Sequence, residues 1–254
     1  MKAMVLAAGL GTRLRPLTDD RPKALVEING HTLLEITLSR LRSIGVHEVM
    51  INVYHFADMI VEYLKANDNF GMRIAVSRED VLLDTGGGLK KAAHFFQDSI
   101  RPRPEDSFIV HNVDVLSTID LRRMMQFHTK NQALATLAVQ DRKTSRYLLF
   151  DDQLRLCGRR LGVDQEPELV RPSPAKPSRQ LHALAFSGIH VISPRLLAMM
   201  TEEGAFSIIT TYLRLAAQGE TILAFRADEY YWRDLGKPEN IAQAALDMKQ
   251  GIAR

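Results

Sequence analysis

The sequence predicts an α/β protein with a Rossmann-like, mixed but mostly parallel sheet flanked by helices. Short apolar runs that suit buried strands alternate with helical patterns along the first two thirds of the chain, which predicts βαβ units. A glycine-rich loop interrupts the first apolar run, as expected beyond the carboxyl end of a strand. After Val139 the pattern changes to hairpins with polar turns, which predicts a β-rich subregion.

The elements of the first half follow from local patterns. Residues 1–7 form an apolar run that ends before Gly9, as a buried parallel strand does. Thr32 and Glu35 form a capping box, and leucines then repeat at helical spacing until Gly45. Further strands are expected at residues 49–53, 73–76, 108–111 and 135–139, and further helices at residues 59–64, 89–96 and 121–128.

The second half mixes strands with fewer helices. A hairpin is expected, with strands 147–150 and 154–156 joined by the polar turn 151–153. Residues 162–180 are rich in Pro, Glu and Arg and predict an exposed excursion. Strands at 184–192, 222–226 and 230–234 and helices at 195–200, 208–217 and 238–248 complete the chain, with Pro238 at a first helical position. We expect one domain, 1–254, made of parts 1–140, 141–236 and a C-terminal helix in 237–254.

The composition narrows the class of protein. A chain of 254 residues with 46% apolar and 25% charged residues is long enough to bury a full core. The basic residues are spread along the chain, so no nucleic-acid partner is expected. The net charge of +3 would suit a protein that binds small polyanionic substrates. No apolar run approaches the roughly 20 residues that span a bilayer, and the first residues do not resemble a secretory signal. The single cysteine, Cys157, favours a reducing compartment, so a cytoplasmic location is expected.

The loop after the first strand is a candidate phosphate site. Its glycines permit positive φ, which lets successive N–H groups converge on an anion, and Arg13 adds a planar fork of donors. A P-loop is excluded because no Gly-Lys-Ser/Thr follows the glycines. A dinucleotide fingerprint is disfavoured because Leu14 stands where the third glycine belongs. On the glycines alone, a simple strand-to-helix turn remains an alternative.

The longer string from Gly9 to Thr18, followed by Arg21-Pro22-Lys23-Ala24-Leu25-Val26, resembles the signature of the sugar-1-phosphate nucleotidyltransferase family. The resemblance extends over most of the chain and implies the nucleotide-diphospho-sugar transferase fold, with residues 1–140 binding the nucleotide and residues 141–236 binding the sugar phosphate. It implies that Arg13 meets the β and γ phosphates of a nucleoside triphosphate and that Lys23 meets the α-phosphate region. The loop residues expected around the triphosphate are Leu6, Ala7, Ala8, Gly9, Gly11 and Thr12.

Two aspartates complete the implied catalytic set. Asp114 follows the strand at 108–111, and Asp234 lies near the end of the chain. The family has an aspartate at each position, which implies that both bind Mg²⁺, an ion that prefers oxygen ligands and commonly combines one or two carboxylates with phosphates. The expected catalytic residues are Arg13, Lys23 and Asp114. Relatives usually carry glycine where this chain has Val113, a side chain expected to crowd the sugar phosphate or to shift the metal.

Substrate contacts are expected from two further segments. Thr85 and Gly86 open a run of three glycines ahead of the predicted helix 89–96, a segment that related enzymes place beside the nucleobase. Asn112, Ser187 and Gly188 are expected at the sugar phosphate. The segments 85–88 and 186–189 most resemble N-acetylmuramate-1-phosphate uridylyltransferases of cell-wall recycling. The histidines lack metal-ligand spacing and are expected to pack in the core or lie at the surface (His111, His128 and His190).

The resemblance implies attack of a sugar 1-phosphate on the α-phosphorus of an NTP, with release of pyrophosphate. No general base is needed, because the second pKa of a phosphate monoester is about 6. UTP is favoured, and GTP or CTP would fit a mannose-1-phosphate guanylyltransferase or a choline-phosphate cytidylyltransferase. A regulatory subunit that binds nucleotide sugars with little turnover is the alternative from another class, which Val113 favours. Family members are often dimeric or larger, so a homo-oligomer is an open expectation.

Overall fold

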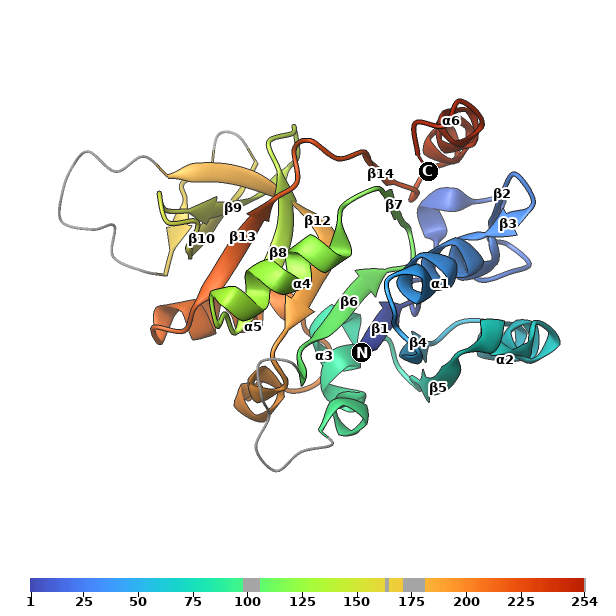
Figure 1. The fold of residues 1–254 in the computed structure, drawn as a ribbon, viewed down its shortest axis with the longest axis horizontal. Coiled ribbons are helices and arrows are strands. Elements are labelled where there is room, and N and C mark those ends of the chain that lie inside the picture. Colours follow the sequence, from blue (N-terminus) through green and yellow to red (C-terminus); the bar gives the residue numbers. More distant parts are fainter. Residues whose placement is uncertain (98–105, 163–164, 171–180, 254) are drawn as a thin grey trace.

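The computed structural model describes residues 1–97, 106–162, 165–170 and 181–253. The centre of the fold is a sheet in which β6, β1, β4 and β5 lie side by side in that order and run parallel (Figure 1). The bounds of these strands are Lys2–Leu6 for β1, Glu48–Val53 for β4, Arg73–Arg78 for β5 and Phe108–Asn112 for β6. The predicted parallel strands of the first half are therefore confirmed, most of them within two residues of the expected ends.

Helices cover both faces of this sheet, because its strands carry apolar side chains in both directions. Val5 packs into one hydrophobic cluster and Met4 into the cluster on the opposite face, as alternating side chains of a strand do. The first cluster includes residues of α1 (Leu33–Ser43), α2 (Ala57–Ala66), α4 (Leu121–Lys130) and α6 (Pro238–Lys249). The second cluster includes residues of α3 (Asp84–Lys91) and α5 (Ile208–Ala217). The fold class expected from the sequence is confirmed.

Beyond β6 the same sheet continues with mostly antiparallel strands. The long strand β12 (His182–Ile192) pairs along one edge with β6 and, further along, with β9 (Arg146–Phe150), and along the other edge with β8 (Ala135–Gln140). β10 (Leu156–Leu161) and β11 (Glu168–Leu169) extend this part, and β13 (Ile222–Arg226) runs parallel to β8. Two short pairs complete the described strands, β2 (Glu27–Ile28) with β3 (His31–Thr32) and β7 (Val115–Ser117) with β14 (Trp232–Asp234).

The predicted strand at 154–156 is wrong, because the turn of the hairpin is longer than the pattern suggests. The Asp151 carboxylate accepts hydrogen bonds from the backbone N–H groups of Gln153 and Arg155, both at 2.9 Å. Leu154 has a positive φ of 58°, so β10 begins only at Leu156. The expected excursion at 162–180 contains β11, and its residues 163–164 and 171–180 lie outside the described structure.

The three consecutive glycines do not precede a helix but lie inside one. α3 begins at Asp84, and the predicted end of this helix is a separate 3₁₀ turn, Ala93–Phe96. A Cβ on Gly86 would lie 2.3 Å from the Phe206 ring, and a Cβ on Gly87 would lie 2.5 Å from the Gly204 carbonyl oxygen. The glycines therefore let α3 approach the segment before α5, and this contact outweighs their low helix propensity.

We expect Gly87→Ala to lower the free energy of unfolding by about 1–3 kcal/mol, as overpacking of a filled interior does. The clash is with backbone, which cannot rotate away as a side chain can. Urea unfolding measures the effect, and Gly9→Ala is the control, because a Cβ there would have no neighbour within 4 Å. Equal stability of the two variants would contradict the packing role.

The three histidines are buried, and their environment lowers their basicity. Nδ1 of His190 lies 2.7 Å from the Tyr212 hydroxyl, and His128 lies between the hydroxyls of Ser107 and Thr136 at 3.1 and 2.9 Å. Burial lowers the pKa of His190 to about 3 and that of His128 to about 4. Burial, aided by the positive charge of Arg40, lowers the pKa of His111 to about 3. All three are therefore neutral near pH 7.

The stability of the fold is expected to fall as the pH drops from 6.5 towards 4. Below the ordinary histidine pKa of 6.5, the unfolded chain binds protons that these buried rings do not bind. The loss is about 2 kcal/mol for each histidine at pH 5. Urea unfolding at pH 7 and pH 5 measures it. His190→Gln should reduce the difference, whereas His47→Gln at an exposed position should keep it. If the loss of stability between pH 7 and pH 5 were the same in both variants, it would not come from His190.

Within the described ranges, no helix is long and apolar enough to cross a membrane.

Candidate active site

The topology creates a crevice at the carboxyl ends of β1 and β6. The chain passes from β1 to β4 and β5 on one side and then returns to β6 on the other side of β1. Loops that leave two neighbouring strands in opposite directions leave a gap between them, and ligands of open α/β sheets bind there. The glycine-rich loop follows β1, and Asp114 follows β6, so this crevice holds two of the predicted site segments.

The glycine-rich loop is held in shape by its own residues. Gly11 has a φ of 67°, and a Cβ on it would lie 2.9 Å from the methyl group of Thr18. The Thr18 hydroxyl donates a hydrogen bond to the Gly11 carbonyl oxygen at 2.9 Å. Glycine is therefore required at position 11 both for the left-handed backbone and for the close approach.

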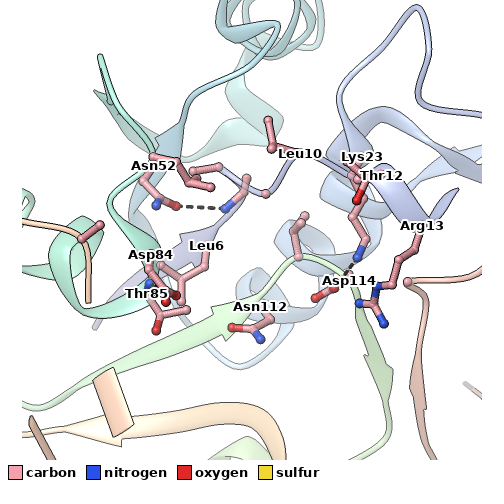
Figure 2. Close-up of a pocket in the computed structure, with 18 residues that line it drawn as sticks. Leu6, Leu10, Thr12, Arg13, Lys23, Asn52, Asp84, Thr85, Asn112 and Asp114 are labelled. Carbon is pink, nitrogen blue, oxygen red and sulfur yellow. Dashed lines mark hydrogen bonds and ion pairs between the residues drawn. The ribbon is translucent and has the colours of Figure 1, made fainter. Parts of the chain in front are cut away.

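A buried polar chain fixes the start of this loop. The backbone N–H of Ala7 donates to the Asn52 side-chain oxygen at 2.9 Å (Figure 2). The Asn52 amide in turn donates to the Glu79 carboxylate at 2.7 Å, and the second Glu79 oxygen accepts from the Leu83 N–H at 2.9 Å. This chain links β1 to β4, β5 and the start of α3. Asn52 and Glu79 were not predicted from the sequence, because no local pattern marks a contact between residues so far apart in the chain.

Lys23 and Asp114 meet in the crevice. Lys23 begins a short 3₁₀ turn (Lys23–Leu25), and its side chain is only 9% exposed. Its amine donates to a carboxylate oxygen of Asp114, and Figure 2 shows the two side chains pointing towards each other. An ion pair this deep in a crevice is only weakly screened by solvent. The pair places a positive charge beside the candidate metal ligand.

Asp234 is brought to the same place by strand pairing. β14 runs antiparallel to β7 with Asp234 opposite Val115, and the Leu235 N–H donates to the Asp114 carbonyl oxygen at 2.8 Å. Asp234 forms an ion pair with Arg13 at 3.8 Å, and one of its oxygens accepts from the Gly236 N–H at 2.7 Å. The two aspartates thus occupy neighbouring backbone positions on paired segments. Their oxygen donors fit Mg²⁺, which commonly completes its shell with substrate phosphates and water.

A cavity of about 490 Å³ joins the glycine-rich loop, Lys23 and Asp114. Its lining includes the predicted nucleotide-binding residues Leu6, Ala7, Ala8, Gly9, Gly11, Thr12, Arg13, Lys23 and Thr85, together with Asp114. Side chains from four separate segments of the chain therefore converge on one space. Gly86 is the exception, because its N–H donates to the Phe206 carbonyl oxygen at 2.9 Å and it packs against that residue instead.

A second cavity of about 940 Å³ continues from the first towards β9 and β10. Asn112, Ser187 and Gly188, the residues expected at the sugar phosphate, all line it, as do Asp114 and Asp234. Gly188 has a φ of 73°, and a Cβ on it would lie 2.9 Å from the Asn112 amide. The Ser187 hydroxyl is buried and has no hydrogen-bond partner in the described structure.

Arg142 and Trp232 form a platform in this second cavity that the sequence analysis missed. The Arg142 guanidinium lies 3.6 Å from the centre of the Trp232 ring, and the indole N–H donates to the Ser187 carbonyl oxygen at 2.8 Å. Arg142 donates to the Phe186 carbonyl oxygen at 2.8 Å, and burial lowers its pKa while nearby Asp234 opposes the shift. Its buried Nε has no hydrogen-bond partner among the residues that the structure describes. An arginine far from any motif gives no sequence signal for such a position.

Comparison with known proteins identifies the family and the fold. A family model described as nucleotidyl transferase matches residues 2–251. The chain belongs to the nucleotidyl transferase family. The N-acetylmuramate alpha-1-phosphate uridylyltransferase of Caulobacter vibrioides is 34% identical over 93% of this chain and 92% of that protein. The mannose-1-phosphate guanylyltransferase of Mycobacterium tuberculosis is 28% identical over 99% of this chain, which spans only 65% of that relative's length.

Solved structures show the same architecture. HddC from Yersinia pseudotuberculosis, in complex with GMP-PN, superposes with a TM-score of 0.74 at 21% identity, covering 97% of this nucleotidyltransferase and 99% of HddC. At this level of identity the likeness establishes the nucleotide-diphospho-sugar transferase fold. The predicted family and enzyme class are confirmed.

Val113, the departure from the family pattern, is accommodated by the core of this nucleotidyltransferase. Val113 lines the first cavity, and its N–H donates to the Leu6 carbonyl oxygen at 3.1 Å. The side chain is only 4% exposed and belongs to the hydrophobic cluster that includes Leu14 and Leu235. The expected crowding of the sugar phosphate therefore has no support from the position of this side chain.

Proposed function

We propose that this nucleotidyltransferase transfers a uridylyl group from UTP to N-acetylmuramate 1-phosphate, giving a UDP-sugar and pyrophosphate. One observation carries the proposal: the glycine-rich loop, Lys23 and Asp114 line one cavity, which continues into a second cavity lined by Asp114 and Asp234. A triphosphate and an acceptor phosphate can therefore approach each other beside Asp114. UTP and N-acetylmuramate follow the relative from Caulobacter vibrioides, which is 34% identical to this chain and is matched over 92% of its own length.

In the proposed reaction an oxygen of the acceptor phosphate attacks the α-phosphorus of UTP. The new bond joins that oxygen to the α-phosphorus, while the bond from the α-phosphorus to the bridging oxygen breaks and pyrophosphate leaves with the electron pair. The loop N–H groups and Arg13 hold the β and γ phosphates, and Lys23 faces the α-phosphate. Catalysis then consists of positioning and charge neutralisation, since the acceptor phosphate is already anionic near neutral pH.

Asp114 and Asp234 are the residues that would hold Mg²⁺ in this reaction. A divalent cation there would neutralise phosphate oxygens and orient both substrates. The ion pairs with Lys23 and Arg13 hold both carboxylates near their working positions. A reaction that consumes UTP also requires a compartment rich in nucleotides, which agrees with the cytoplasmic location favoured by the sequence.

The test is a matrix of nucleotides and acceptors scored by pyrophosphate release. UTP, GTP and CTP are each combined with N-acetylmuramate 1-phosphate, mannose 1-phosphate and choline phosphate, with and without Mg²⁺. The proposal expects the highest kcat/KM for UTP with N-acetylmuramate 1-phosphate. A highest value for GTP with mannose 1-phosphate or for CTP with choline phosphate would replace it. Nucleotide binding without pyrophosphate release from any acceptor would indicate a regulatory subunit.

A further inference from the structure

The far end of the second cavity is rich in arginine. Four arginines line this cavity: Arg13 and Arg142 lie near Asp234, whereas Arg146 and Arg159 belong to β9 and β10. The acidic residues in its lining are Asp84, Asp114 and Asp234, and the latter two belong to the catalytic end already described. A cluster of guanidinium groups without a matching lining carboxylate favours an anionic ligand.

The sheet places two of these arginines on one face. In the β9–β10 ladder Arg146 lies opposite Leu161, and Arg159 lies opposite Leu148. Arg146 and Arg159 are therefore diagonal neighbours, a relation that spans about 7–8 Å and lets long side chains reach a common ligand. All four of these residues line the cavity, so this face points into it.

The two side chains differ in their present partners. Arg159 forms an ion pair of 2.6 Å with Glu168 on β11, whose side chain is 56% exposed. Arg146 is exposed, and its guanidinium has no hydrogen bond or ion pair to any residue that the structure describes. An unpaired guanidinium beside a weakly held one is well suited to grip a carboxylate or phosphate through paired hydrogen bonds.

The position of the cluster fixes which part of the acceptor it meets. β9 and β6 pair with the same edge of β12, β6 at Ile189–Ile192 and β9 at His182–Ala185. The four residues from Ile189 to Ala185 span about 13 Å of strand, so β9 lies beyond the carboxyl end of β6. The acceptor's 1-phosphate must lie near Asp114, directly after β6. Arg146 and Arg159 are therefore placed to meet a group on the far side of the sugar ring, while Arg142, near Asp234, remains close to the phosphate.

We propose that Arg146 and Arg159 form a specificity site for a second anionic group of the acceptor, so that the enzyme selects sugar 1-phosphates that carry a carboxylate. This proposal rests on the proposed function, whose acceptor has such a group in its lactyl ether. A sugar 1-phosphate whose sugar carries no charged group would leave these guanidinium groups without a ligand.

The decisive measurement compares two acceptors that differ in this group alone. N-acetylglucosamine 1-phosphate lacks the lactyl ether of N-acetylmuramate 1-phosphate and is otherwise the same. Wild type should prefer the acidic acceptor in kcat/KM, and Arg146→Gln and Arg159→Gln should each reduce kcat/KM for it by about 10-fold to 100-fold, the scale of a charged hydrogen bond. The kcat/KM for N-acetylglucosamine 1-phosphate should change less than about threefold in either variant.

Arg73→Gln is the matched control, because Arg73 lies opposite Glu48 on β5 and β4 and pairs with it as Arg159 pairs with Glu168. It should leave both acceptors unaffected. Equal losses for both acceptors in Arg146→Gln, or no loss for either, would overturn the specificity site. A preference for glucose 1,6-bisphosphate over glucose 1-phosphate, with none for N-acetylmuramate 1-phosphate, would overturn its carboxylate selectivity.

Failure of the proposed function gives a different result. If wild type releases no pyrophosphate with either acceptor, the uridylyltransferase assignment fails, and calorimetric binding of both acceptors then tests the arginine site alone. Tighter binding of N-acetylmuramate 1-phosphate to wild type than to Arg146→Gln would support the site. Equal affinities would overturn it.

Discussion

Lys23→Ala is expected to lower kcat at least about 100-fold, because preorganised charges in water-excluded sites contribute most to reactions of this kind. The Lys23 amine is held in the crevice by Asp114 and is therefore aimed before any substrate arrives. Its loss removes the positive charge that would face the α-phosphate as the new bond forms. Initial rates of pyrophosphate release at saturating substrates measure kcat, and circular dichroism with urea unfolding checks the fold.

Two further variants separate this role from packing. Lys23→Met keeps most of the side-chain volume and should lose as much activity as Lys23→Ala. Lys91→Ala is the matched control, because Lys91 also pairs with an aspartate, Asp80, but lies at the exposed end of α3. It should keep kcat within about twofold, since surface ion pairs contribute little. Near-normal turnover of folded Lys23→Met would rule out the catalytic role.

Asp114→Asn should lower kcat as much as Lys23→Ala does, and it should also change how the rate depends on Mg²⁺. The amide keeps the shape of the side chain but loses the charge that attracts a divalent cation. We expect kcat to fall at least about 100-fold at millimolar Mg²⁺. The Mg²⁺ concentration needed for half-maximal rate should rise. Both quantities come from rates measured across a Mg²⁺ titration.

Asp80→Asn provides the control for this second variant, because the Asp80 side chain is 96% exposed and pairs with Lys91. Its Mg²⁺ dependence should match that of wild type. An Asp114→Asn enzyme with reduced kcat but an unchanged Mg²⁺ requirement would show that Asp114 acts only by orienting Lys23. Normal kcat would refute both roles.

The sequence predicted those parts of the fold that depend on local periodicity. Helix α5 and strand β13 have the bounds expected from their apolar spacing, because each buries one stripe or face against a large core. The predicted start of a strand at position 154 was wrong, because hydrogen bonds to the Asp151 carboxylate extend the turn beyond its polar residues. The prediction that the glycines precede a helix was wrong, because the segment they pack against, before α5, lies more than 100 residues away in the chain.

The candidate site divides in the same way. Lys23 and Asp114 were found because a long string of residues and a strand end mark their positions, and the crevice brings them together. Arg142 and Glu79 were not found, because each acquires its role from a tertiary contact. Such contacts leave no spacing in the sequence.

One continuous ladder of backbone hydrogen bonds joins the two halves of the catalytic crevice, since β12 pairs directly with β6. The loop after β1 and the residues around Gly188 are thus carried by a single sheet rather than by two bodies joined by a hinge. In the proposed reaction, the separation of the two phosphate-binding regions would therefore follow from strand spacing, a distance that hardly varies among proteins. Alignment of the substrates is in this sense a property of the sheet itself, and loops and side chains need only adapt to what each substrate carries.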